Sequence, residues 1–133
     1  MDLDRTPATI AHEIAEQTRA LNHRTLDPAV YGEPGDVSEV VYALRTVVER
    51  MPQALNQASA GLRRLAEAGG IRMDDGTNPG VAAERALSAL RDATGALWTV
   101  QEALVEASGP LSHMGGHLAA DVEDEEAGEG AAV

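Results

Sequence analysis

Large apolar residues recur at alternating steps of four and three along residues 36–68. Positions spaced in this way stay on one side of an α-helix, so the pattern predicts a long amphipathic helix that packs lengthwise against a second helix. At about 1.5 Å per residue, this central helix would span roughly 50 Å. Its expected inward line consists of Val37, Val41, Leu44, Val48, Met51, Leu55, Ala58, Leu62 and Leu65.

A proline lies inside this central helix. Asp36 is the expected N-cap, with Glu39 three residues later as the second half of a capping box. Pro52 removes a backbone hydrogen bond, which costs about 3 kcal/mol in a helix interior. If the helix ended and restarted there, Met51 would be the new N-cap, although methionine has no suitable side-chain acceptor. Because the apolar spacing also continues in phase past Pro52, we predict a single kinked helix.

A second helix is predicted near the N-terminus. Thr6 followed by Pro7 is typical of an N-cap and the first helical position. This helix should end near Leu26, because the residue before Pro28 avoids the helical region. Residues 27–35 are rich in proline and glycine and should connect it to the central helix.

The segment after the central helix predicts an antiparallel partner for it. Gly69 and Gly70 should end the central helix. Asn78 and Pro79 then repeat the cap-and-proline start, and the new helix should end near Ser108. Its apolar line is Leu87, Leu90, Leu97, Val100 and Leu104, with Ala86, Ala93 and Ala107 alongside, whereas Trp98 lies off that line with Thr94, Gln101 and Val105.

These elements together predict an all-α fold: an antiparallel helical hairpin plus the N-terminal helix, forming a three- to four-helix bundle. The fourth helix would be short, within residues 110–120, and would use Leu111, Met114 and Leu118. Residues 1–120 are assigned to this helical bundle domain, which has the size of one domain. Residues 121–133 are acidic and rich in Gly and Ala, so we expect a disordered tail.

The composition limits the classes of partner. The net charge of the 133 residues is −12, which disfavours nucleic-acid backbones and anionic membranes. The absence of Cys excludes disulfides and thiol chemistry. The acidic N-terminus is not followed by an apolar signal segment, and no run of about eighteen apolar residues occurs. We therefore expect a cytoplasmic protein that binds neither nucleic acid nor a membrane.

One histidine pair has the spacing of metal ligands. His113 and His117 are four residues apart, so both would lie on one face of a helix. The zinc-protease pattern fails because no Glu follows His113. Gly115 and Gly116 lie between the two histidines and loosen their geometry, which favours solvated surface histidines. We predict no catalytic, cofactor-binding or metal-binding residue, and an enzyme is the least favoured class.

The leading functional hypothesis is therefore a small acidic, non-catalytic helical module for protein–protein interaction, with a protein partner or a second copy forming a homodimer. An alternative is that the chain resembles substrates of the actinobacterial type VII secretion system, which are small helical hairpins without a signal peptide. The Trp-x-Gly turn of those substrates is absent, because Trp98 lies in mid-helix and is followed by Thr99 and Val100. A second alternative is an acidic mimic of nucleic acid.

Overall fold

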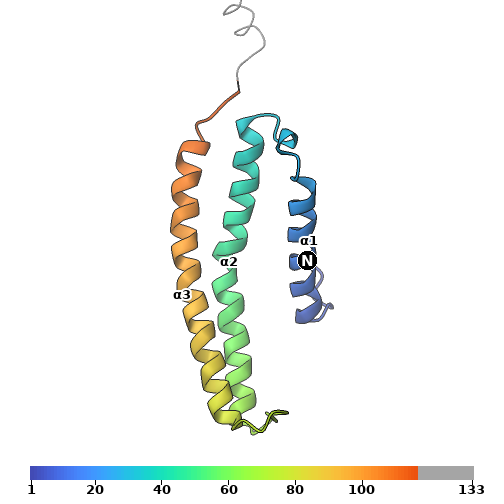
Figure 1. Cartoon of the computed structure of the whole chain (residues 1–133), viewed down its shortest axis with the longest axis vertical. Helices are drawn as coiled ribbons and strands as arrows, with labels where there is room; N and C mark the ends of the chain where they lie inside the picture. Colours follow the sequence, from blue (N-terminus) through green and yellow to red (C-terminus); the bar gives the residue numbers. More distant parts are fainter. Residues whose placement is uncertain (117–133) are drawn as a thin grey trace, which may run out of the picture. The chain divides into compact units, whose positions relative to one another are not determined.

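A computed structural model describes residues 1–116, and every regular element in this range is a helix (Figure 1). The elements are α1 (Pro7–Arg24), the short 3₁₀ helix η1 (Pro28–Val30), α2 (Pro34–Glu67) and α3 (Pro79–Leu111). The all-α prediction is confirmed. Met1–Glu33 forms one compact unit, and the described residues from Pro34 onward form another. The expected tail, Leu118 and His117 lie outside the described residues.

Helix α1 begins as the sequence predicts. The Thr6 side chain accepts a hydrogen bond from the backbone N–H of Thr9 at 3.2 Å, and Pro7 is the first helical residue. The helix ends at Arg24, two residues before the expected end, and the backbone N–H of Thr25 bonds to the carbonyl of Leu21 at 3.0 Å. None of the residues of α1 is fully buried, so this helix contributes little core of its own.

Helix α2 starts three residues earlier than expected, and the predicted capping box is wrong. The first helical residue is Pro34, so Asp36 lies in the first turn and is not the N-cap. The physical reason is that proline is preorganised for the first helical position, where its missing N–H costs nothing. Asp36 is still favourable there, because the helix dipole stabilises negative charge near the N-terminus.

Pro52 does not interrupt α2, which confirms the prediction of one continuous helix. Pro52 is among the few buried residues of the described chain, together with Ala83 and Leu87 of α3. The backbone carbonyl of Val48 loses its donor at this point. Burial of the proline ring offsets part of that cost, because the ring replaces a side chain in the contact with α3.

Helices α2 and α3 pack side by side as an antiparallel hairpin (Figure 1). Helix α2 ends in a Schellman motif, in which Gly69 has a φ of +68°. The N–H of Gly70 bonds to the carbonyl of Leu65 at 2.9 Å, and the N–H of Gly69 bonds to that of Ala66 at 3.1 Å. Both the glycine stop and the hairpin are as predicted.

The start of α3 is also as predicted, but its end is not. The Asn78 side chain accepts from the backbone N–H groups of Gly80 and Val81 at 2.9 and 3.2 Å. The helix continues through Pro110 to Leu111, so the expected end near Ser108 is wrong. A proline in the last turn removes a single bond of the helix, which leaves the preceding turns intact. The expected separate fourth helix does not form between residues 112 and 116.

The interface between the two helices follows two rows that alternate in steps of three and four. All members of these rows are half-buried or buried. We call them the inner rows: on α2 they are Ser38, Val41, Arg45, Val48, Pro52, Leu55, Ser59, Leu62 and Ala66, and on α3 they are Ala83, Leu87, Leu90, Thr94, Leu97, Gln101, Leu104, Ser108 and Leu111.

The expected inward line of α2 is therefore only half right. Its members Val41, Val48, Leu55 and Leu62 do face α3. Leu44, Met51 and Leu65 instead remain 38%, 40% and 52% exposed. At the levels of these three residues, α3 contacts the next residue of α2, so that Arg45, Pro52 and Ala66 take the inner positions expected for Leu44, Met51 and Leu65. On α3, Thr94 and Gln101 belong to the inner row, although the sequence placed them off the apolar line beside Trp98, whereas Val100, expected on that line, is exposed.

The Schellman motif gives a direct test of the end of α2. We expect Gly69→Ala to lower the free energy of unfolding by about 1 kcal/mol, because a Cβ is strained at positive φ. Gly95→Ala is the matched control, since nothing lies within 4 Å of a Cβ added there in mid-helix. That control should raise the free energy of unfolding by about 0.5–1 kcal/mol. Urea unfolding followed by circular dichroism measures both, and equal effects would contradict the assignment.

Candidate functional site

Each helix of the hairpin carries a second apolar row beside its inner row. On α2, which we call the α2 row, these residues are Val37, Val40, Leu44, Val47, Met51, Ala54, Ala58, Gly61 and Leu65. On α3, the α3 row, they are Ala86, Ala89, Ala93, Ala96, Val100, Ala103 and Ala107. The steps again alternate between three and four, so each row follows one flank of its helix.

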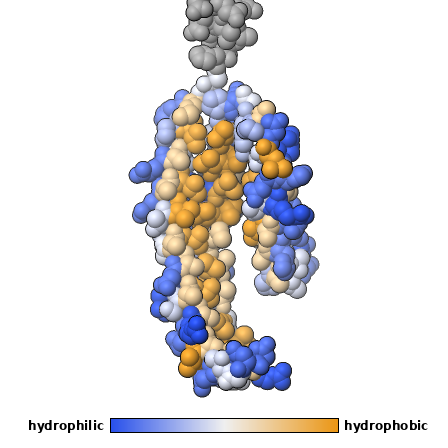
Figure 2. Space-filling model, in the orientation of Figure 1, coloured by the Kyte–Doolittle hydropathy of each residue, from blue (hydrophilic) through white to orange (hydrophobic). Residues whose placement is uncertain are grey.

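The two rows lie on the same face of the hairpin. Each residue of the α2 row and of the α3 row comes one position before an inner-row residue in the sequence. In an antiparallel pair of helices, the positions just before the inner rows lie on one face of the pair, and the positions just after the inner rows lie on the opposite face. The opposite flanks do meet, because Tyr42 of α2 and Val105 of α3 line one groove. Figure 2 shows apolar side chains side by side over α2 and α3. We call the surface formed by the α2 row and the α3 row the apolar face.

The apolar face is open to solvent. Val47 and Val100 are 41% and 44% exposed, and Leu44, Met51 and Leu65 are exposed to a similar or greater degree. The alanines of the α3 row are exposed throughout. The sequence pattern did not reveal this surface, because Leu44, Met51 and Leu65 of the α2 row were expected at the hairpin interface.

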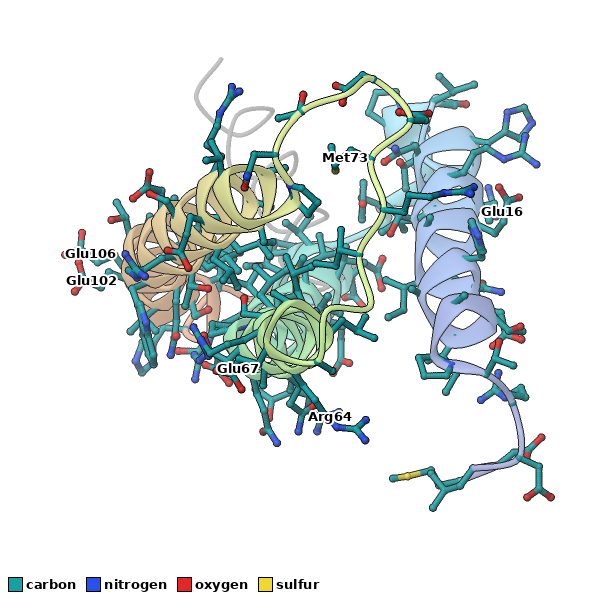
Figure 3. All side chains as sticks on the ribbon, turned by 90° about the horizontal axis from the view of Figure 1, so that it is seen from below. Glu16, Arg64, Glu67, Met73, Glu102 and Glu106 are labelled. Carbon is teal, nitrogen blue, oxygen red and sulfur yellow. The ribbon has the colours of Figure 1, made fainter. Side chains whose placement is uncertain are left out.

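Charge is strictly separated from the apolar face. None of the Asp, Glu and Arg residues of α2 and α3 belongs to the α2 row or the α3 row. Figure 3 shows Glu102 and Glu106 on the outer side of α3, and Arg64 and Glu67 on the outer side of α2. Large contiguous apolar patches at a protein surface are typical of interaction sites. The absence of charge along both rows was a readable sequence signal for the apolar face.

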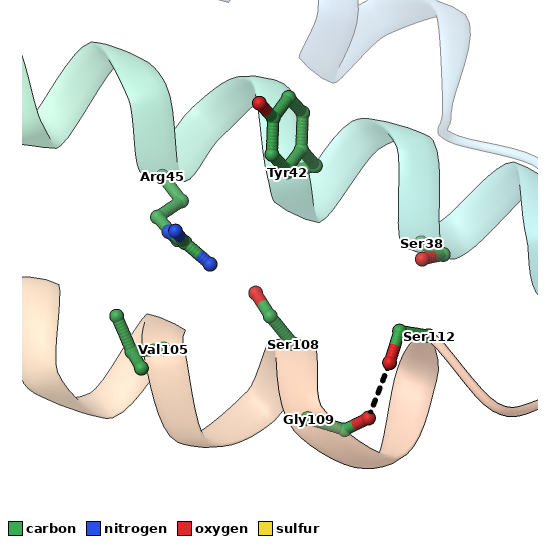
Figure 4. A pocket seen from close by; sticks show the side chains of 7 residues that line it. All are labelled: Ser38, Tyr42, Arg45, Val105, Ser108, Gly109 and Ser112. Carbon is green, nitrogen blue, oxygen red and sulfur yellow. Dashed lines mark hydrogen bonds between the residues drawn. The ribbon is translucent and has the colours of Figure 1, made fainter.

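The opposite face of the hairpin carries a polar groove at the end where α2 begins (Figure 4). Arg45 is the one charged residue of the inner rows, and its Nε donates to Glu49 Oε1 at 2.8 Å. Its guanidinium carbon lies 5.8 Å from the ring centre of Tyr42, within the range of a cation–π contact. The groove is lined by Ser38, Tyr42, Arg45, Val105, Ser108, Gly109 and Ser112.

Two serine hydroxyl groups of this groove are engaged with the backbone. Ser108 Oγ donates to the carbonyl of Leu104 at 2.7 Å, and Ser112 Oγ donates to that of Gly109 at 2.7 Å. The charge of Arg45 is compensated by Glu49 on the same helix. Among the residues that line the groove, no side chain could act as a general base toward a hydroxyl. The groove therefore has no arrangement typical of nucleophilic catalysis.

A shallower groove lies further along the same side of α3, formed by Trp98, Gln101, Glu102, Val105 and Glu106. Trp98 is in mid-helix and 55% exposed, off the leucine line as expected. Gln101 Oε1 is buried and has no hydrogen-bond partner among the described residues. A buried amide oxygen without a donor destabilises the hairpin at this point.

The structure brings no metal site together in residues 1–116. His113 lies in an exposed turn after the end of α3, and His117 is outside the described residues. No group of three or more His, Asp or Glu residues in this range is placed to hold a metal ion.

The acidic loop before α3 forms a turn. Asp75 Oδ1 accepts from the backbone N–H of Thr77 at 3.0 Å, and Gly76 has a φ of +77°. Hydrogen bonds from the backbone N–H and then the hydroxyl of Thr77 hold the pKa of Asp75 below its usual value. These residues thus have the backbone roles expected of Asp, Gly and Thr in a turn.

Comparisons of the chain with protein-family models, with curated proteins and with solved structures find no match in any of the three. Within residues 1–116, no helix has both the length and the apolar character needed to cross a membrane. The physical features of the hairpin are therefore the basis for a functional proposal.

The buried amide of Gln101 can be tested by an apolar replacement. We expect Gln101→Leu to raise the free energy of unfolding by about 1–2 kcal/mol, because it removes an unpaired buried oxygen and adds apolar contact. Chemical unfolding followed by circular dichroism measures the change. Gln53→Leu, at an exposed position of α2, is the control and should leave the stability nearly unchanged. A loss of stability in Gln101→Leu would show that the amide has a partner in solution.

Proposed function

We propose that this chain is a non-catalytic helical module that binds a protein partner through the apolar face of its hairpin. The observation that carries the proposal is an exposed, uncharged surface that extends over both α2 and α3. At about 25 cal/mol for each Å² of apolar surface removed from water, covering even half of such a face would favour association strongly.

The chemistry of the apolar face limits the kind of partner. The face contains aliphatic side chains and alanines and no charged group, so a partner must offer an apolar helical surface of similar length. The alanines of the α3 row allow a helix backbone to approach closely. The rims of the face carry charges of both signs, which would orient a partner more than they would strengthen its binding.

The alternative functions have less support. Residues 34–116 contain seven Arg and ten Asp or Glu, a net charge of −3, and the charges are of mixed sign along the helices. A mimic of nucleic acid requires a rigid array of negative charge, which this pattern does not supply. A secreted hairpin substrate would share the helical hairpin, but no feature of the described residues favours secretion over an interaction role.

Affinity purification from the source cells tests the proposal. Met51 belongs to the α2 row and is 40% exposed, so Met51→Arg places a charge on the apolar face at a position open to solvent. We expect at least one polypeptide to be recovered with the wild-type chain and lost with Met51→Arg, because a buried unpaired charge opposes association. Mass spectrometry identifies the recovered polypeptides.

Gln53→Arg is the matched control, because it adds the same charge two residues away on the exposed polar side of α2. It should recover the same polypeptides as the wild-type chain. Circular dichroism should show equal helix content in all three proteins. Identical recovery with the wild-type chain, Met51→Arg and Gln53→Arg would contradict a docking role for the apolar face.

A further inference from the structure

We propose that the occupant of the apolar face is a second copy of this chain, paired through a two-fold axis parallel to the helices so that α2 of each copy packs on α3 of the other. This inference rests on the proposed function, since it names the partner of the same surface. The product is a four-helix bundle in which each helix is antiparallel to both of its neighbours.

The first argument is the difference in side-chain size between the two rows. The α2 row carries large side chains such as Leu44, Val47 and Met51, whereas the α3 row is alanine at every position except Val100. A two-fold interface uses the same surface of both copies, so that surface must be complementary to itself. Packing the α2 row on the partner's α3 row sets Leu44 and Val47 against alanines, whereas Ala54, Ala58 and Gly61 further along the α2 row also meet alanines.

The register of the hairpin determines which residues would meet in this pairing. Ser38 and Ser112 line one groove together with Arg45 and Val105, which shows which residues of α2 and α3 lie at the same level. A two-fold axis parallel to the helices preserves this level. Each step forward along α2 from Arg45 corresponds to one step back along α3 from Val105, because the helices are antiparallel. Met51 of one copy therefore lies at the level between residues 96 and 100 of the other copy.

The size of the apolar face is sufficient for a stable dimer. Helices of 34 and 33 residues are about 50 Å long, and two adjacent helices present a face on the order of 800 Å². Standard protein interfaces bury about this area on each partner. Helix α1 has only 18 residues, so it is too short to cover the whole length of the face.

Electrostatic repulsion does not oppose this pairing strongly. The hairpin residues carry a net charge of only −3, a small part of the total of −12. No charged side chain belongs to the surfaces that would become buried, so dimer formation needs no desolvation of an ion.

The mass of the full-length protein in solution is the first test. Size-exclusion chromatography with light scattering should give twice the chain mass of 13.9 kDa for the wild-type protein. Met51→Arg and Ala93→Arg, one in each row, should raise the dimer dissociation constant by about a hundredfold or more, with unchanged helix content by circular dichroism. Gln53→Arg should remain dimeric. A wild-type protein of 13.9 kDa at all concentrations would overturn the inference.

Disulfide trapping tests the arrangement of the two copies, because the chain has no cysteine of its own. Met51→Cys and Val100→Cys are purified separately in reduced form, mixed, allowed to exchange subunits and oxidised. A disulfide-linked pair of chains should form in the mixture and not in either protein alone. Efficient linkage in Met51→Cys alone would place α2 against α2 and overturn the proposed pairing. Gln53→Cys mixed with Glu102→Cys is the control, since both positions lie outside the apolar face.

The affinity experiment separates failure of this inference from failure of the proposed function. A monomeric wild-type chain that still recovers another polypeptide in a Met51-dependent way would overturn pairing with a second copy and support a different partner. A chain that shows no Met51-dependent association of any kind would overturn both proposals.

Discussion

Helix α2 has more apolar surface than α3 can cover, and the rest of the hairpin follows from this mismatch. Its apolar residues occupy an arc wide enough for two parallel rows. One row packs against α3, and the other remains half-exposed beside it. A single helix contact buries roughly one stripe of its partner, so the second stripe stays in water unless another helix covers it.

The hairpin interface itself is thin and partly polar. Only Pro52 of α2 and Ala83 and Leu87 of α3 are buried among the described residues of the two helices. The inner row of α3 includes Thr94, whose hydroxyl donates to the carbonyl of Leu90 at 3.0 Å, and other short polar side chains. Such residues satisfy their own hydrogen bonds within the helix but add little apolar burial. A hairpin of this composition gains much from any partner that covers its apolar face.

The distribution of charge connects the fold to its proposed role. Arg45 is the only charged residue in the inner rows, and it is paired with Glu49 at the polar groove. All other charges of α2 and α3 lie outside the α2 row and the α3 row, which leaves one uncharged face and one polar face on the same hairpin. The uncharged row comes one position before the inner row in both helices. The two uncharged rows therefore lie on the same face of the antiparallel hairpin.

The sequence alone determined the helices, most of their ends and the antiparallel hairpin, because these depend on local signals. Thr6 and Asn78 cap their helices, and Gly69 ends α2 through its positive φ. Two ends were predicted wrongly because the Pro34 start signal was overlooked and a proline in the last turn of α3 was taken as a stop. Only the tertiary structure decided which apolar row of α2 faces α3, and thereby that the candidate docking surface exists. Both rows have the spacing of a helix interface, and the periodicity of one helix contains no information on the side from which its neighbour approaches.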